Sequence, residues 1–409
     1  MRVLIVAGNI SARMGGEAVI PLHYIRELTK LGVEVHALTH ERVRKELESH
    51  PVFRADRFHF IADSAPEKAI HALGKKAPGA LRETLFLSAV GLVTQARLAR
   101  RARGLARDIG VDLIHQPIPV SPAFPSFLSA MPAPIVIGPM NGGMDFPPAF
   151  RKEYSQGSGG VVSLARGLSG LANRVIPGKR QAALLLVSNE RTREALPKGV
   201  DKARAVTLVE NGVDLALWDR PARDKPQDPV FLFVGRLVWW KAVELLIAAI
   251  ERTPGAHLRI IGDGPERPRL QALAASGSAA ARIHFDGFRP QSEIADALCA
   301  ATALVLPSLR ECGGAVILEA FACRTPAIAT RWGGPEDYIT PETGFLVDPS
   351  GREAFIAGLA DAMTILAADP ARAQSMGASA RARVEQHFTW EAKARRMLEI
   401  FEGVRSQSR

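Results

Sequence analysis

The chain has 409 residues and a formal net charge of +10, with 47 % hydrophobic and 23 % charged residues. These are ordinary globular proportions, and the length exceeds a single hydrophobic core, so we expect two domains of roughly 200 residues each. The three cysteines fit neither a disulfide framework nor a zinc site, which favours a reducing compartment.

The start of the chain and its net charge indicate the compartment of the protein and the class of partner that it binds. Residues 1–10 have the pattern of a strand and become polar too soon for a signal peptide. No apolar run reaches the 18 or so residues of a membrane span, so we expect a cytoplasmic protein. The positive charge favours an anionic partner, and composition leaves open a phosphorylated ligand, a lipid surface or a nucleic acid.

The first half opens with a strand, a loop, a helix and a second strand. The loop ends in Gly15 and Gly16 at the N-terminus of the helix, where bare amides and the helix dipole favour an anion. A structural turn explains these glycines equally well, and they do not fit the G-x-G-x-x-G dinucleotide fingerprint. The expected elements are strand Arg2–Ala7, helix Glu17–Leu31 and strand Val33–Thr39.

More strands follow in the first half, and their ends carry candidate substrate contacts. In open α/β sheets, ligands gather at the carboxyl ends of the strands. His115 closes one strand, Ser121 follows it, and Asn141 lies in a glycine-rich loop after the next. These three are candidates, although an ordinary loop role accounts for each of them as well. The expected elements are strands His59–Ala62, Asp112–Gln116, Pro134–Gly138 and Ala182–Ser188, and a long helix, Leu81–Asp108.

The second half repeats the alternation of strands and helices. Leu215–Asp228 is rich in proline, aspartate and arginine and lacks apolar periodicity, so it is predicted to be the domain linker. The alternation after it predicts a parallel, doubly wound sheet in each half. The expected elements are strands Val230–Val234, Leu258–Gly262, Arg282–Asp286, Ala303–Leu306 and Ala327–Thr330, and helices Val243–Glu251, Glu266–Ala275, Ser292–Ala300 and Ala315–Cys323.

Two carboxylates flank a glycine-rich turn in this half. Glu319 is the lone charge in an apolar helix, where a carboxylate is costly unless something binds it. Glu311 stands eight residues earlier in the loop, and Gly313 and Gly314 leave amides bare at the helix N-terminus. The stretch therefore offers an anion cradle between two carboxylates. The alternative is a buried strand–helix unit with Glu319 near an exposed end.

Two cations follow the first strand of the second half. Arg236 comes directly after Gly235, and Lys241 stands at the start of a helix, where a cation opposes the helix dipole. A local rule broken in this way often marks a functional site. An anion bound between these cations and the Gly313–Gly314 turn would resolve the conflict. The alternative is a pair of solvated surface cations.

These residues carry a family resemblance that extends over nearly the whole chain. The motifs are G-R-L followed by Lys241, G-D-G-P at Gly262–Pro265, and Glu311-x7-Glu319. In this order the chain resembles the family 4 retaining glycosyltransferases with the GT-B fold. The resemblance implies two Rossmann-like, doubly wound parallel-sheet domains facing a central cleft. It implies an acceptor domain over residues 1–214, joined by a returning C-terminal helix at 389–409, and a nucleotide-sugar donor domain over 215–388.

The resemblance also implies a role for each residue that matches a motif of the family. Arg236 and Lys241 would bind the diphosphate of a nucleotide-sugar donor and stabilise the leaving group. Glu311 would contact the donor sugar, and Glu319 would bind the ribose hydroxyls. The remaining donor contacts implied by the motifs are Gly15, Gly16, Gly262, Phe288, Arg289, Gly313, Gly314 and Ala315.

The chain departs from the family pattern in two places. The family often has glycine after the phosphate-binding lysine, where this chain has Ala242, and a Phe-Gly pair where it has Cys312-Gly313. Neither change removes a charged group, so we expect an altered pocket shape and retained activity. The chain contains no D-x-D motif, so we expect neither a metal nor another cofactor. Fixed cations would stabilise the departing diphosphate instead.

The sequence thus predicts an enzyme that transfers a sugar from a nucleotide diphosphate sugar, with retention, to a glycan or lipid-linked acceptor. The expected setting is surface polysaccharide, exopolysaccharide or glycoconjugate biosynthesis. The alternatives are another GT-B activity, namely a sugar-phosphate synthase or a nucleotide-sugar epimerase, and a non-catalytic polyanion binder. The chain has no nucleic-acid-binding motif, so we expect no nucleic acid partner.

The long basic helix Leu81–Asp108 suggests where the protein binds a lipid-linked acceptor. Leu85, Ala89, Leu92 and Ala96 recur at helical spacing in its first half. Its second half carries Arg97, Arg100, Arg101, Arg103 and Arg107, of which Arg100, Arg103 and Arg107 form one stripe. Such a surface favours anionic lipid, so we predict peripheral binding at the inner face of the cell membrane. An ordinary helix with a solvated basic face is the alternative.

Overall fold

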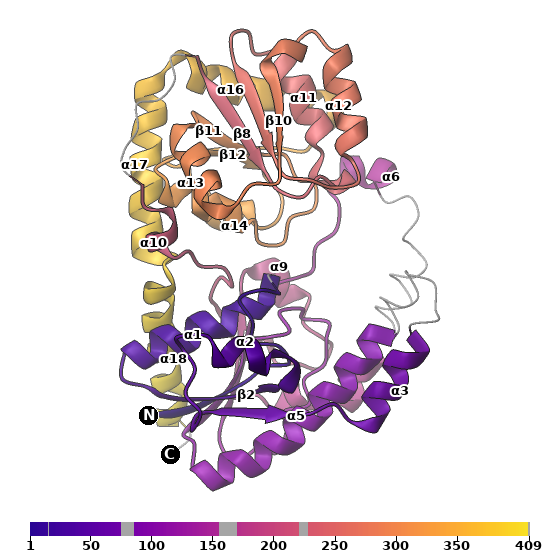
Figure 1. Cartoon of the computed structure of the whole chain (residues 1–409), viewed down its shortest axis with the longest axis vertical. Coiled ribbons are helices and arrows are strands. Elements are labelled where there is room, and N and C mark those ends of the chain that lie inside the picture. The colour runs from indigo at the N-terminus through magenta and orange to yellow at the C-terminus, as the bar shows by residue number, and fades with distance from the viewer. Residues whose placement is uncertain (15, 75–85, 155–169, 221–227, 408–409) are drawn as a thin grey trace. The chain divides into compact units, whose positions relative to one another are not determined.

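A computed structural model describes residues 1–14, 16–74, 86–154, 170–220 and 228–407. The chain divides into two compact units. The first comprises Met1–Gly143, Gly160–Glu210 and Lys393–Arg409, and the second comprises Met144–Gly159 and Asn211–Ala392. Figure 1 colours both units by position in the sequence. In the prediction from sequence, residues 144–154 were not separated from the first half.

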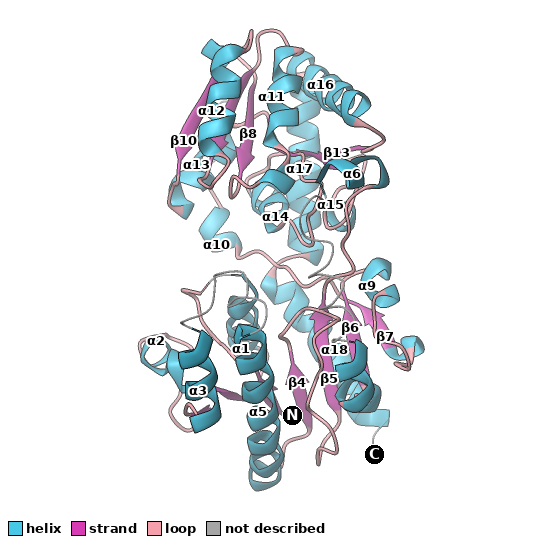
Figure 2. Ribbon diagram, turned by 90° about the vertical axis from the view of Figure 1, so that its right-hand side faces the viewer, coloured by secondary structure: helices cyan, strands magenta, loops and turns pink. Residues whose placement is uncertain are grey.

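The first unit is built on a parallel sheet of seven strands in the order β3-β2-β1-β4-β5-β6-β7. Figure 2 shows β4, β5 and β6 side by side. The strands are β1 Arg2–Val6, β2 Glu34–His40, β3 Phe58–Ile61, β4 Leu113–Gln116, β5 Ile135–Met140, β6 Leu184–Val187 and β7 Ala205–Thr207. The helices are α1 Ile20–Lys30, α2 Arg44–Glu48, α3 Ala65–Gly74, α5 Leu87–Ile109, α8 Gly178–Gln181 and α9 Glu190–Glu194. α18, Trp390–Gln407, begins in the second unit and belongs to the first from Lys393 onward.

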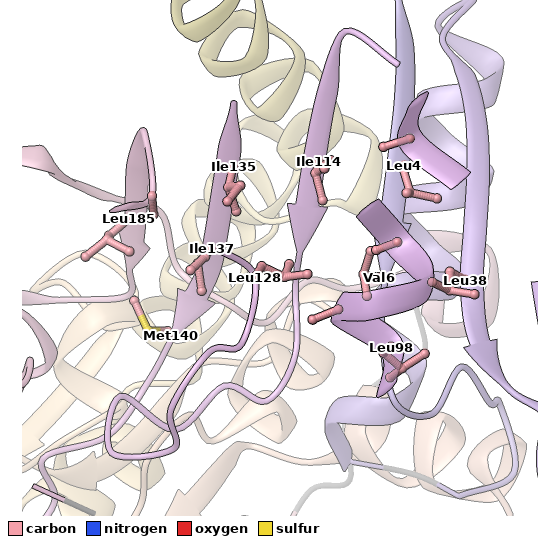
Figure 3. Packing of buried hydrophobic residues seen from close by; sticks show 14 of the residues in the cluster. Leu4, Val6, Leu38, Leu98, Ile114, Leu128, Ile135, Ile137, Met140 and Leu185 are labelled. Atoms are coloured by element: carbon pink, nitrogen blue, oxygen red, sulfur yellow. The ribbon is translucent and has the colours of Figure 1, made fainter. Parts of the chain in front are cut away.

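The core of the first unit lies between this sheet and α5. Strand residues such as Leu4, Leu38 and Ile114 are fully buried and pack with Leu98 of α5, as Figure 3 shows. α5 presents Leu98, Ala102 and Leu105 to this cluster. The face predicted from Ala89, Leu92 and Ala96 is only half-buried, and Leu85 lies outside the described residues.

The second unit contains a parallel six-stranded sheet in the order β10-β9-β8-β11-β12-β13. Its strands are β8 Val230–Val234, β9 His257–Ile261, β10 Ile283–Gly287, β11 Ala303–Leu306, β12 Ala327–Thr330 and β13 Gly344–Val347. Its helices are α6 Arg151–Tyr154, α10 Leu215–Trp218, α11 Val243–Glu251, α12 Arg267–Ser276, α13 Gln291–Ala300, α14 Ala315–Ala322, α15 Pro335–Tyr338, α16 Arg352–Ala368 and α17 Pro370–His387. α11 contacts α12 and α16, while α14 contacts α13 and α17.

The predicted α/β class with parallel sheets is confirmed. The start of the predicted linker differs, because residues 215–218 form the short helix α10 and its Trp218 is buried. Among the described residues, no single helix is long and apolar enough to cross a membrane; α16 and α17 pass only when counted together, across a bend of 103°.

Glycines allow the loops at the carboxyl ends of these strands to approach each other closely. Gly262 follows β9 with a φ of +140°, and a Cβ added there would lie far inside van der Waals distance of the Gly235 carbonyl oxygen. Both the backbone conformation and the contact therefore require glycine.

We expect Gly262→Ala to destabilise the second unit by about 2–4 kcal/mol, because the loop after β8 must move to admit the methyl group. The measurement is the midpoint of urea unfolding. Gly351→Ala is the matched control, since a Cβ at Gly351 meets nothing within 4 Å. Equal midpoints for the two variants would contradict the close approach.

Candidate functional site

The first part of the site is the turn after β8. Residues 239–241 form a 3-10 turn, and the Leu309 amide donates to the Trp240 carbonyl oxygen at 3.0 Å. The loop after β8 and the loop after β11 are thereby joined through their main chains. Arg236 is exposed, and among the residues that the structure describes its guanidinium has no ion-pair partner.

The two loops meet in an ion pair between the Lys241 ammonium and the Glu311 carboxylate. The side chains are only 17 % and 14 % exposed, so the pair is shielded from solvent. The sequence predicted both residues as separate ligand contacts, and the structure brings them into direct contact. An incoming anion would have to compete with Glu311 for the lysine.

Ala242 follows the lysine in a left-handed conformation, with φ 51° and ψ 37°. This conformation disfavours a residue with a Cβ by about 1–2 kcal/mol. The position is the one at which the family often has glycine, so the backbone shape is retained although the residue differs. Ala242 is fully buried, and its methyl group fills space at the start of α11.

The glycine turn after β11 leads into α14. Gly314 has a φ of +73° and occupies the cap position, and no side chain from the described part of the chain caps the helix. The Gly334 amide donates to the Glu311 carbonyl oxygen at 2.8 Å, which fixes the turn from the loop after β12. The main chain around Gly313 and Ala315 is thus set in place without side-chain caps.

Glu319 lies on α14, half-buried, and has no ion-pair partner among the described residues. Burial raises the pKa of its carboxyl group to about 7. One turn later, a hydrogen bond with Cys299 and burial raise the pKa of the Cys323 thiol. Burial therefore disfavours the charged form of Glu319, and a hydrogen-bond donor from a ligand would relieve this.

Two other predicted donor contacts follow β10. Phe288 is 82 % exposed, directly after Gly287 with its φ of +71°. The Arg289 side chain donates to the Asp286 carbonyl oxygen at 3.0 Å and pairs with Glu293 at 3.3 Å. Phe288 is thus a free aromatic surface, whereas Arg289 is held by its own loop.

In the first unit, the structure places His115 in the core instead of at a strand-end surface. The ring is fully buried, with edge contacts to Tyr24 of α1 and Phe401 of α18 at 5.5 and 5.2 Å. Its Nε2 lies 2.7 Å from the Gly138 carbonyl oxygen, and burial lowers the pKa to about 4. His115 is a neutral packing residue in this position.

Asn141 and Ser121 are brought to neighbouring loops. The Asn141 amide donates to the Val120 carbonyl oxygen at 2.8 Å, and its side chain donates to Glu210 at 2.7 Å. Asn141 is buried, whereas Ser121 is exposed. Of these two residues, Ser121 is therefore the one that is open to solvent.

The loop after β1 already holds an anion from the protein itself. The amides of Ala12 and Arg13 donate to Glu46 at 2.7 and 3.1 Å, and the Ser11 hydroxyl donates to the same carboxylate at 2.7 Å. Gly16 is exposed with a φ of +54°, and Gly15 lies outside the described residues.

One cluster in the described residues has the spacing of a metal site, namely His40, Asp63 and Glu67. The Arg42 amide donates to His40 Nδ1 at 3.1 Å, so the ring proton sits on Nε2, which lies 3.2 Å from Asp63. Glu67 accepts hydrogen bonds from Ser64 and Thr94 and pairs with Arg97. The nitrogen that faces the cluster carries a proton and Glu67 is saturated, so the residues do not fit a metal.

Comparison with known families agrees with the geometry of the second unit. Residues 217–383 match the family model described as glycosyl transferases group 1. The matched residues all lie in the second unit, which is therefore similar to the glycosyl transferases group 1 domain. The resemblance predicted from the sequence is confirmed, and the Lys241–Glu311 pair lies within this domain.

Individual proteins of known name are also similar to this chain in sequence. The chain is 36 % identical to an alpha-maltose-1-phosphate synthase of Mycolicibacterium smegmatis over 221 residues, which cover 49 % of this chain and 57 % of that protein. The chain spans about half the length of the curated relatives it matches.

Two solved structures share the fold over the whole length. A sucrose-phosphate synthase from Thermosynechococcus elongatus aligns with a TM-score of 0.67 at 22 % identity, covering 99 % of each chain. The Anabaena protein HepE in complex with UDP aligns with a TM-score of 0.67 at 18 % identity, covering 98 % of this chain and 100 % of that one. The fold is therefore GT-B, as the resemblance implied.

The second unit also includes a segment that the sequence analysis did not single out. Phe146, Phe150 and Tyr154 stand four residues apart and are all buried against the second unit. The regular aromatic spacing in the proline-containing stretch 144–154 is the signal that could have indicated a packed segment.

The raised pKa of Glu319 predicts a pH-dependent effect of Glu319→Gln. Between pH 4.5 and 7 the folded wild type binds more protons than the unfolded chain, so its stability falls as the pH rises. Glutamine does not titrate, so the variant lacks this loss in the free energy of unfolding, which is at most about 3 kcal/mol. We expect the variant to gain stability relative to the wild type between pH 5 and pH 8, measured by urea unfolding.

The exposed Glu293→Gln serves as the control and should show no such pH-dependent gain. A Glu319→Gln variant whose stability tracks the wild type at every pH would contradict the burial of an unpaired carboxylate.

Proposed function

We propose that the protein is a retaining glycosyltransferase that moves a sugar from a nucleotide diphosphate sugar to a glycan or lipid-linked acceptor without a metal. The observation that carries this proposal is the shielded Lys241–Glu311 pair, together with the half-buried Glu319 on α14, within the segment that matches the glycosyl transferases group 1 model. Together these groups offer a cation for phosphate and two carboxylates for hydroxyl groups.

The chemistry follows from where charge develops during the reaction. The departing nucleoside diphosphate gains negative charge, and preorganised cations stabilise it as it forms. Lys241 would exchange its contact with Glu311 for the diphosphate, and the exposed Arg236 is available for the same anion. Glu311, once released, would accept hydrogen bonds from the sugar, and Glu319 would accept them from the ribose.

A second candidate is a sugar-phosphate synthase, which also uses a nucleotide-sugar donor. It is favoured by the names of the alpha-maltose-1-phosphate synthase relative and of the sucrose-phosphate synthase with the same fold. The two candidates differ in the acceptor. Transfer to a sugar phosphate would support the synthase, and transfer only to a glycan or lipid-linked sugar would support the first proposal.

We expect Lys241→Ala and Arg236→Ala each to slow sugar transfer by about 10²–10³-fold, because each removes a group that stabilises the leaving diphosphate. The assay is release of the nucleoside diphosphate from a panel of UDP-, GDP- and ADP-sugars with acceptor present. Lys198→Ala, at an exposed position in the first unit, is the control and should keep full activity.

The same assay in excess EDTA tests the metal-independent mechanism. Turnover should persist, and complete loss that Mg²⁺ or Mn²⁺ restores would overturn this part of the proposal. Near-normal turnover of both alanine variants would overturn the assignment of the diphosphate site.

We also propose that the protein works in the cytoplasm, in surface polysaccharide or glycoconjugate assembly, with α5 on an anionic membrane surface. The structure changes which arginines are available. The Arg103 guanidinium donates to the Ser129 carbonyl oxygen at 2.7 Å, and Arg97 pairs with Glu67, so both are engaged within the unit. The exposed arginines are Arg100, Arg101 and Arg107.

Exchanging Arg100, Arg101 and Arg107 for Glu should abolish co-sedimentation with vesicles that contain phosphatidylserine. Each arginine near anionic lipid contributes about 1 kcal/mol, screened over a Debye length of about 8 Å, so wild-type binding should also fall with salt. Exchanging the exposed Arg42, Lys45 and Lys198 alters the net charge equally and is the control. Equal loss in both triple variants, or equal binding to neutral vesicles, would contradict docking through α5.

A further inference from the structure

The segment Met144–Tyr154, here named the bracing segment, packs on both loops that carry the Lys241–Glu311 pair. It follows Gly143 of the first unit in the chain but groups with the second unit, where Figure 2 shows its helix α6 among the other helices. Its aromatic side chains are nearly inaccessible to solvent: Phe146 is 5 % exposed and Tyr154 7 %. The segment is therefore part of the core of the second unit.

Phe146 contacts both loops with one ring. It stacks on Trp239, with ring centroids 5.4 Å apart and an interplanar angle of 24°. The Arg310 guanidinium lies 5.9 Å from the Phe146 ring centroid. Trp239 stands two residues before Lys241, and Arg310 directly precedes Glu311. The ring thus links the backbone next to the lysine with the backbone next to the carboxylate.

Neighbours of Phe146 hold the bracing segment at the same place. The Trp332 indole N–H donates to the Asp145 carbonyl oxygen at 2.8 Å. A Cβ added at Gly333 would lie 2.7 Å from Met144 Cε, so this side chain packs directly on the loop after β12. The next residue of that loop, Gly334, donates to the Glu311 carbonyl oxygen.

The C-terminal end of the bracing segment is held by further contacts, with α16, α11 and Trp239. Phe150 packs on Phe355 of α16 at 6.0 Å, and the Tyr154 hydroxyl donates to Glu244 of α11. Tyr154 also stacks on Trp239 at 6.0 Å, so Trp239 lies against two rings of the segment. The ring partners of Phe150 in the described part of the chain are Tyr154 and Phe355, which lie in neither loop that bears the pair, so Phe150 is a matched comparison for Phe146.

We propose that Phe146 is a positioning residue for the diphosphate part of the donor. Resting on the proposed function, this assigns the first half of the chain a part in donor binding. The ring fixes the turn with Lys241 relative to the loop with Glu311, so the ammonium stands where the donor diphosphate arrives. Base and ribose contacts lie elsewhere, at Phe288 and Glu319, and do not depend on Phe146.

The test compares nucleoside diphosphate with monophosphate binding by calorimetry. The probe is whichever of UDP, GDP and ADP the wild type binds most tightly, with its monophosphate alongside. Phe146→Ala should weaken diphosphate binding about tenfold, because displacements near 1 Å at a site have large effects, and leave monophosphate binding within about twofold. Phe146→Tyr keeps the stacking ring and should restore wild-type binding.

Two further variants separate positioning from loss of stability. Phe150→Ala should lower the melting temperature without changing the ratio of diphosphate to monophosphate affinity. Phe146→Ala added to Lys241→Ala should cost little more than Lys241→Ala alone, since both act through the lysine. If Phe146→Ala does not fold, Phe146→Leu keeps the apolar volume, lacks the ring, and is expected to show the same selective loss.

The outcomes that overturn the inference are distinct from those that overturn the proposed function. If the wild type binds none of the three diphosphates, the proposed function fails and this inference fails with it. If the wild type binds one of them but Phe146→Ala and Phe150→Ala change the affinity ratio equally, or not at all, only the positioning role of Phe146 is wrong.

Discussion

The candidate site depends on loops that touch through their main chains at the carboxyl ends of the strands. Gly262 packs on the Gly235 carbonyl group, and Gly334 donates a hydrogen bond to Glu311. A Cβ at Gly262 would lie 1.9 Å from the Gly235 carbonyl oxygen and one at Gly334 would lie 2.4 Å from the Cys312 carbonyl oxygen, so either loop would have to move to admit a side chain. The loops after β8 and β11 are themselves joined by the hydrogen bond from the Leu309 amide to the Trp240 carbonyl oxygen, next to which Lys241 and Glu311 pair.

A second constraint comes from aromatic burial along the bracing segment. Phe146, Phe150 and Tyr154 recur every fourth residue, and large aromatic side chains contribute strongly when they leave water. Their partners are Trp239, Arg310 and Phe355, all in the glycosyltransferase domain. The division of the chain by packing therefore differs from its division by sequence order, and a domain separated at residue 214 would lose this segment.

Much of the fold could be predicted because buried parallel strands are apolar runs bounded by glycine and polar residues. β8, β11 and β12 match their predicted bounds, whereas β13, which was not predicted, begins with glycine and has its two middle side chains only half-buried. Lys241 and Glu311 were found as charges in loops after strands, but their contact spans 70 residues and no local pattern encodes it. His115, predicted at a strand end, is buried because a strand covered on both faces stays buried to its last residues.

The Lys241–Glu311 pair also bears on which anions the candidate site can bind. With the carboxylate in place the lysine is already neutralised, so a small ion such as inorganic phosphate must break a shielded pair to gain one cation. Under the proposed function, a nucleoside diphosphate would make the same exchange but would add contacts through its base and ribose. The pair would thus disfavour inorganic phosphate by charge, while a ligand with further points of attachment could still bind.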